Sequence, residues 1–305
     1  MKKFLLRLLC FSLPLLVAMG ALEAWLESVP NVARDKHRWM TEHSRVVSTL
    51  VLGHSHNFYG IRPELLGPGA YNLALPSQTY RYDYCLLTHY PMDALRTVIL
   101  NYDYFQLWED FERQPNERFQ AMRYRIYMDC DVHPRLSWYG FEVLCPPLVR
   151  KKLLDSGEAQ AAHCDSLGWG TEYSLESRPA DWDNGALRAE GNTRHDSSIT
   201  VLNEQILDSL FAHCRRRAIR VVMVNTPTTA LFRRHEDPRQ LALNRRVLAN
   251  LLRRNPEVTF LDYEADSAFT ADDFFDADHL NQYGAKKLTL MLRDTLNSLP
   301  CSSTH

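Results

Sequence analysis

The sequence predicts an α/β fold, a three-layer α/β/α sandwich around a mainly parallel, five-stranded sheet. Short apolar runs typical of buried strands recur along the chain, and stretches with the periodicity of amphipathic helices lie between them. The run at residues 98–100 is apolar without a break, as expected for a parallel strand buried on both faces. Strands and helices that alternate in this way form parallel sheets with right-handed connections. The predicted strands are residues 46–52, 70–75, 96–102, 218–224 and 258–261.

Helix signals follow these strands in order along the chain. Ser77 can cap a helix at residues 78–90. Asp237 and Pro238 are the N-cap and first-turn proline of a later helix, which we expect to end near residue 255. Two further helices are predicted at about residues 198–210 and 282–298.

The length and composition of the chain favour one domain. It has 305 residues, of which 45% are apolar, and we place that domain at residues 45–300. The regular pattern is lost between about residues 106 and 195, where Tyr, Trp and Arg are frequent. We predict a mostly helical insertion with a long loop at the mouth of the site. Long loops inside compact domains are usually functional, although the same residue types also pack ordinary insertions.

The N-terminus has the pattern of a secretory signal or a signal anchor. Basic residues precede an uncharged run at residues 8–22, which Glu23 ends. Because apolar and amphipathic residues continue without a break, we expect residues 1–29 to form an uncleaved anchor and residues 30–44 a juxtamembrane segment. The domain would then lie outside the cytoplasm, periplasmic or extracellular, on the membrane. Cleavage after Gly20 and a buried helix of a cytosolic protein are the alternatives.

The charge argues against one class of partner. A net charge of −2 and a pI near 6.6 do not suit a nucleic-acid-binding protein, whose affinity depends on neutralising phosphates. An arginine-rich stretch at residues 215–254 precedes an acidic one at residues 262–278. We interpret both as solvated faces and loops, with a groove for an anionic polymer as the alternative.

The seven cysteines are scattered, with no Cys-x-x-Cys and no metal-ligand spacing. If the chain is exported, Cys130 with Cys145 or Cys164 is a candidate disulfide, although sequence alone does not give connectivity. Inert buried cysteines are the alternative.

Two stretches carry the candidate chemistry. The first strand stops at Gly53 and delivers Ser55 to its carboxyl end, where open α/β sheets place their ligands. Near the other terminus, Asp276 and His279 form an Asp-x-x-His just before a helix. A serine hydroxyl needs a base to take its proton, and the base works best when a carboxylate orients it. Ser55, His279 and Asp276 supply one of each.

The blocks Gly53-His54-Ser55 and Asp276-Ala277-Asp278-His279, in this order, resemble those of the SGNH (GDSL-like) hydrolase superfamily. The resemblance covers residues 46–299 apart from the insertion. It implies a flavodoxin-like fold in which Ser55 is the nucleophile, His279 the base and Asp276 its orienter. It also implies an oxyanion hole made by the backbone amides of Ser55 and Ala74, with the side chain of Asn101 as a further donor.

Other polar residues are candidates for contact with the substrate, and each also has a structural interpretation. His56, Asn72, Arg194 and His195 could line the pocket, or they could tie turns and loops. His54 and His56 beside His279 suggest a metal, but no further ligand stands at a telling spacing, and we predict none. No glycine-rich phosphate loop occurs either, and we predict no cofactor.

Together with the predicted anchor, the resemblance implies a serine-dependent acyl-ester hydrolase or O-acyltransferase that acts on a cell-envelope or extracellular polysaccharide, as similar envelope-anchored proteins do. Its partners would be a carbohydrate or acyl-ester substrate and the membrane, without nucleic acid. Two other classes remain open. One is an SGNH-like domain that binds glycan without catalysis, and the other is an assembly protein with a partner in an envelope complex.

Overall fold

The computed structural model contains a five-stranded sheet in which every pair of neighbours is parallel, in the order β2-β1-β3-β4-β5. It describes residues 1–111, 118–130, 132, 140–154 and 163–298. The predicted α/β class, strand number and strand direction are therefore confirmed. The strands are β1 Thr49–Val51, β2 Ala70–Asn72, β3 Thr97–Asn101, β4 Arg220–Asn225 and β5 Thr259–Asp262.

The sheet has a hydrophobic core on each face, because successive side chains of a strand point to opposite sides. In β3, Val98 and Leu100 belong to the larger core and Ile99 to the smaller one. In β4, Met223 joins the larger core and Val222 the smaller. Continuous apolar runs are thus required in both strands, as the sequence predicted for β3.

Helices cover both faces and complete the three layers. The larger core receives side chains from α2 (Val32–His43), α5 (Tyr80–His89), α9 (Ser198–Arg216) and α11 (Pro238–Arg254). The smaller core is closed mainly by α12 (Gln282–Ser298), which also packs against α3 (Ser55–Gly60) and α4 (Pro63–Leu66). The short α10 (Ala230–Arg234) contacts the inserted α8.

The helix starts follow the local signals in part. Asp237 caps α11 as predicted, since its Oδ1 accepts hydrogen bonds from the amides of Arg239 and Gln240 at 2.8 and 2.9 Å. Ser77 does not cap α5, which begins two residues later with Thr79 at the N-cap. Ser77 instead has a φ of 59°, in the left-handed region that non-glycine residues rarely adopt.

The insertion contributes three helices among the described residues, and its residues 112–117, 131, 133–139 and 155–162 lie outside them. The helices are α6 Arg118–Met128, α7 Pro146–Leu154 and α8 Gly185–Gly191. Between α7 and α8, the described residues 163–184 are mostly loop. Short 3₁₀ turns lie at Ser44–Val46, Gln106–Trp108, Glu142–Leu144 and Ala271–Asp273.

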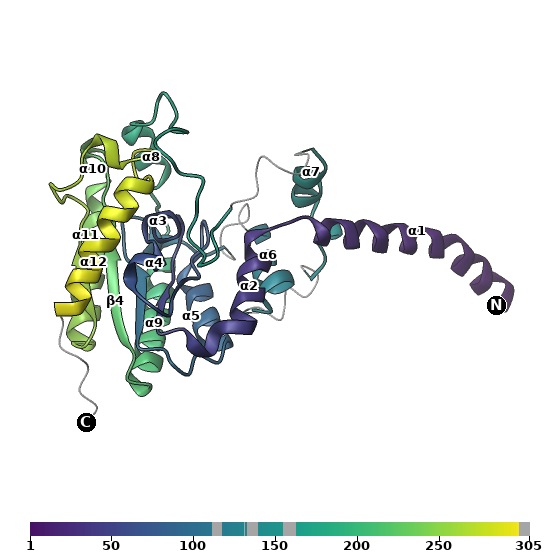
Figure 1. Cartoon of the computed structure of the whole chain (residues 1–305). Helices are drawn as coiled ribbons and strands as arrows, with labels where there is room; N and C mark the ends of the chain where they lie inside the picture. Colours follow the sequence, from purple (N-terminus) through teal and green to yellow (C-terminus); the bar gives the residue numbers. More distant parts are fainter. Residues whose placement is uncertain (112–117, 131, 133–139, 155–162, 299–305) are drawn as a thin grey trace.

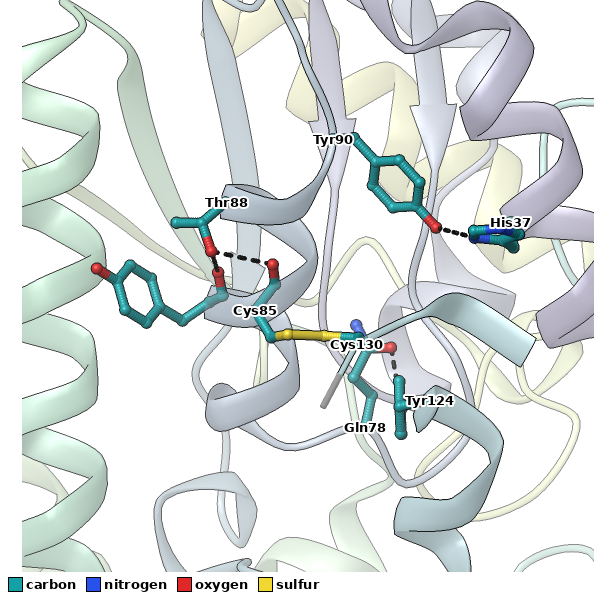
Figure 2. Close-up of a disulfide and its surroundings, with 8 residues drawn as sticks. His37, Gln78, Cys85, Thr88, Tyr90, Tyr124 and Cys130 are labelled. Carbon is teal, nitrogen blue, oxygen red and sulfur yellow. Dashed lines mark hydrogen bonds between the residues drawn. A yellow bond between two sulfur atoms is a disulfide. The ribbon is translucent and has the colours of Figure 1, made fainter. Parts of the chain in front are cut away.

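A disulfide joins this insertion to the sheet domain. Cys130, just after α6, is bonded to Cys85 in α5, and its backbone amide donates to the carbonyl of Tyr124 at 3.0 Å (Figure 2). The suggested pairing of Cys130 with Cys145 or Cys164 is therefore wrong. In the fold, α6 packs against α2 and the larger core, to which α5 also contributes. Cys130 therefore meets Cys85 of α5, which lies 45 residues earlier in the sequence.

The N-terminal helix α1 (Lys2–Ser28) is long and apolar enough to cross a membrane. It extends away from the domain on the side opposite α12 (Figure 1). Its C-terminal end contacts the rest of the protein. Leu26 is buried, and the carboxylate of Glu23 accepts hydrogen bonds from the amides of Glu142 and Val143 at 2.8 and 2.7 Å. The C-terminal end of α1, where the apolar run of the helix stops, therefore contacts the insertion.

Candidate active site

Ser55 is the first residue of α3, reached through a tight turn after β1. Gly53 has a φ of +115°, and a Cβ there would lie 2.1 Å from Oδ1 of Asn101. The same Oδ1 accepts the amide of His54 at 3.0 Å, and the Asn101 Nδ2 donates to Oδ1 of Asn57 at 3.0 Å. The turn therefore requires glycine at residue 53, and the buried side-chain amide of Asn101, from β3, holds the turn in place.

Asp276 and His279 form a compact turn before α12. Oδ1 of Asp276 accepts hydrogen bonds from the amides of Asp278 and His279 at 3.1 and 2.9 Å. It also lies 2.9 Å from Nδ1 of His279. An antiparallel bridge between Phe274 and Leu280 closes the turn. Backbone geometry thus fixes the carboxylate that faces the imidazole.

The structure brings the two stretches together at the carboxyl end of the sheet. Nε2 of His279 lies 2.8 Å from Oγ of Ser55. Since Nδ1 faces the carboxylate of Asp276, Nδ1 carries the proton of the neutral ring and Nε2 is free to accept that of the serine. This is the relation between nucleophile, base and orienter that acyl transfer requires.

A second carboxylate stands beside the base. Oδ1 of Asp278 lies 3.4 Å from Nδ1 of His279 and also receives the guanidinium of Arg188, whose Nη2 is 2.7 Å away. Burial lowers the pKa of His279, but the charges and hydrogen bonds of Asp276 and Asp278 outweigh burial and raise it above its ordinary value. The sequence pointed to Asp276 alone as the partner of this imidazole.

A pocket of about 290 Å³ opens in front of Ser55 and His279. Most of its lining is polar or aromatic, and the insertion supplies a substantial part of it. The lining residues are His54, Ser55, Tyr59, Pro76, Ser77, Phe105, Gln106, Glu109, Phe111, Tyr173, Arg188, Asn192, Arg194, Asp278 and His279.

Two predicted oxyanion donors are engaged elsewhere and do not border this pocket. The amide of Ala74 donates to Oδ1 of Asn72 at 3.0 Å, and the side chain of Asn101 holds the turn at Gly53. Ser77, which the sequence reasoning used only as a helix cap, borders the pocket with Ser55. Among the described residues, the backbone amides of Ser55 and Ser77 have no hydrogen-bond acceptor. The positive φ of Ser77 could not be recognised in the sequence.

The four predicted substrate-binding residues divide between the pocket and the interior. Arg194 borders the pocket and pairs with Glu109 at 2.7 Å, whereas His195 is exposed and does not line it. Asn72 is buried and donates to the carbonyls of Asn57 and Ile61 at 2.8 and 2.9 Å.

His56 is also buried, and it lies behind Ser55 instead of lining the pocket. Its Nδ1 is 3.1 Å from Oδ2 of Asp103 and its Nε2 is 3.5 Å from Oδ2 of Asp278. Burial lowers the pKa of His56, but the two neighbouring carboxylates prevail and raise it to about 9. The position of His56 between Asp103 and Asp278 therefore favours its protonated form. The sequence assigned neither carboxylate a role in the site.

Two groups of these side chains have ligand atoms within 4.8 Å of one another, close enough to share a metal ion: His54, His56 and Asp103, and His56, Asp278 and His279. Hydrogen bonds already use many of these atoms. Nδ1 of His54 accepts the amide of His56 at 3.3 Å, so Nε2 carries the proton that it donates to Asp103 at 2.5 Å. Metal binding to Nε2 would require His54 to give up that proton.

Comparison of the sequence with models of protein families and with curated proteins finds no match. Among solved structures, an assigned acylhydrolase from Bacteroides fragilis aligns with a TM-score of 0.42 and 11% identity, over 85% of this chain and 94% of that one. A GDSL-like lipase from Bacteroides thetaiotaomicron aligns with a TM-score of 0.41 and 10% identity, over 88% and 98%. At these values the chemistry has to be inferred from the site itself.

Proposed function

We propose that the protein is a serine-dependent acyl-ester hydrolase or O-acyltransferase with Ser55 as nucleophile, His279 as general base and Asp276 as its orienter. The observation that carries this proposal is the unbroken contact from Asp276 through His279 to Ser55, with distances of 2.9 and 2.8 Å. Residues from opposite ends of the sequence meet in hydrogen-bonding geometry at a pocket. A serine that only formed part of a turn would not require a histidine and a carboxylate beside it.

In the proposed reaction, Oγ of Ser55 attacks the ester carbonyl while Nε2 of His279 takes the hydroxyl proton. The imidazolium is stabilised by Asp276 and returns the proton to the leaving alcohol. The amides of Ser55 and Ser77 are the proposed oxyanion donors, in place of Ala74 and Asn101, because they border the pocket and have no acceptor among the described residues. Water or a sugar hydroxyl then receives the acyl group.

We infer that the substrate is a small acyl ester of a cell-envelope or extracellular polysaccharide. A polar pocket of about 290 Å³ suits a short acyl group better than a long lipid chain. Gln106, Asn192 and Arg194 give the pocket polar side chains, and Tyr59 and Tyr173 give it aromatic surface. The apolar helix α1 would hold the domain at the outer face of a membrane, near such a polymer.

The test is labelling of the full chain, in detergent micelles, with a fluorophosphonate probe that reacts with activated serines. We expect Ser55→Ala and His279→Ala to abolish labelling. Ser209→Ala, which changes an exposed serine of α9, is expected to leave it unchanged. A folded wild-type protein that resists the probe would contradict the catalytic proposal and favour a glycan-binding domain. Release of the acyl group from acylated polysaccharides, compared with long-chain esters, then tests the substrate class.

A further inference from the structure

A chain of imidazoles and carboxylates continues from the proposed triad into the interior; its two ends, His54 and Asp278, border the pocket, whereas His56 and Asp103 do not. His54 contacts Asp103, Asp103 contacts His56, and His56 contacts Asp278, with distances of 2.5, 3.1 and 3.5 Å. Asp278 in turn reaches Nδ1 of His279 at 3.4 Å. The side chains of the first four residues are at most 3% exposed, so solvent screens their charges little.

The carboxylate of Asp278 contacts three side chains besides that of His279. Its Oδ1 accepts Nε of Arg188 at 2.8 Å, and its Oδ2 accepts Nδ2 of Asn192 at 3.2 Å. His56 completes this set on the buried side. These contacts keep Asp278 beside Nδ1 of the base while Asp276 makes the closer contact.

His56 has a different position relative to the base. Its ring centroid lies 4.9 Å from that of His279, with an angle of 84° between the ring planes, and no hydrogen bond joins the two rings in the structure. Its contacts are with Asp103 on one side and Asp278 on the other, and these two carboxylates favour the cationic form of its ring. A cation here opposes a second positive charge on His279, whereas the carboxylate of Asp278 favours that charge.

We propose that Asp278 and His56 are paired positioning residues that set the charge at the base from behind the triad, Asp278 favouring the imidazolium of His279 and His56 opposing it. This inference rests on the proposed function of the same site. It assigns a role to two buried residues that do not react with the substrate. It also explains why His56 does not face the pocket.

Other groups also face His279, and they stay constant in the test. They are Ser55, Tyr59 from α3, Tyr173 from the loop before α8, Arg188 from α8, and Asp276 from its own turn. Single substitutions at residues 56 and 278 therefore each change one charge of the proposed pair.

The experiment measures the rate of fluorophosphonate labelling of the full chain from about pH 5 to about pH 9. Labelling requires neutral His279, so the midpoint of its acid limb reports the proton affinity of that imidazole. Asp278→Asn removes a negative charge and is expected to move the midpoint to lower pH, by roughly one unit. His56→Gln removes a positive charge and is expected to move it to higher pH by a similar amount. The double variant is expected to return close to the wild type.

A purely structural role would slow labelling in both variants without moving their midpoints in opposite directions. Asp272→Asn is the matched control, because this exposed carboxyl lies in the same segment of the chain and its side chain has no hydrogen-bond or ion-pair partner among the described residues. Its midpoint should equal that of the wild type. Shifts of the same sign at residues 56 and 278, or no shift in either folded variant, would overturn the proposal.

A measurement on the wild-type chain covers the case in which a variant does not fold or the serine does not react. In ¹⁵N NMR spectra of histidine-labelled full chain in micelles, both ring nitrogens of one buried imidazole should remain protonated between about pH 6 and about pH 8. Assignment to His56 supports the buried cation. A neutral His56 across this range would refute the inference whether or not Ser55 is catalytic.

Discussion

Substitution of Gly53 tests whether the contact between the turn and β3 positions the nucleophile. In Gly53→Ala the new Cβ would lie 2.1 Å from Oδ1 of Asn101, at a φ of +115°. The backbone strain costs about 1–3 kcal/mol. Asn101 must also move, which weakens its hydrogen bonds to His54 and Asn57, worth about 1 kcal/mol each. We therefore expect a loss of unfolding free energy on the order of 3–5 kcal/mol.

Gly67→Ala is the matched control for this substitution. Gly67 has a φ of +117°, but a Cβ there meets nothing within 4 Å. The control should carry the backbone strain of about 1–3 kcal/mol and little else. The difference between the two variants, about 2 kcal/mol, is then the contribution of the contact with Asn101.

The two variants are compared by urea unfolding of the full chain in detergent, followed by tryptophan fluorescence, and by the rate of fluorophosphonate labelling. Because a displacement of about 1 Å at a reacting group can slow a reaction about 100-fold, we expect labelling to slow strongly in Gly53→Ala and little in Gly67→Ala. Equal losses of stability and equal labelling rates would refute the argument that Asn101 positions the turn before Ser55.

Three further predictions concern protons and the disulfide. Labelling of the wild type should rise with pH through a midpoint above 6.5, because neighbouring carboxylates raise the pKa of His279; a lower midpoint contradicts this reading. Burial raises the pKa of Asp83 to about 7 despite its hydrogen bonds from Gln78 and Gly53, so the folded state holds a proton that the unfolded chain loses near pH 4. Unfolding free energy should then fall as pH rises from about 4 to about 7, by at most about 4 kcal/mol, and Asp83→Asn should remove this component in urea titrations. Cys85→Ser should lower the unfolding free energy by roughly 2–4 kcal/mol, and reduction of the wild-type disulfide should lower it by the same amount. An unchanged unfolding free energy would contradict a stabilising role for the bond to Cys130.

The strands, and the meeting of Ser55, His279 and Asp276, could be predicted because their signals are local. A continuous apolar run such as Val98 to Leu100 fits only a strand with both faces buried, and β3 has that position. Ser55 follows a predicted strand, and His279 stands just before a predicted helix. In a parallel sheet these ends gather at one edge, so the chain order alone indicated that they could meet.

The partners of these residues could not be predicted, because they depend on distances between segments far apart in the sequence. Asn101 was expected to face the oxyanion, yet it is committed to Asn57 and to the amide of His54. Ser77 borders the pocket through a left-handed backbone conformation, for which a serine gives no compositional signal. Cys85 was not considered as a partner for Cys130, since the docking of α6 decides that pair.

The sequence by itself determined the alternation of strands and helices and the apolar N-terminal segment, and it indicated Ser55, His279 and Asp276 as the candidate triad, because each depends on the order and spacing of neighbouring residues. Only the tertiary structure decided which charges surround the base. Asp278, His56 and Arg188 act on His279 through separations of a few ångströms. Such separations exist only after α3, α8 and the turn before α12 have packed together, and Coulomb energies in a buried site depend steeply on them.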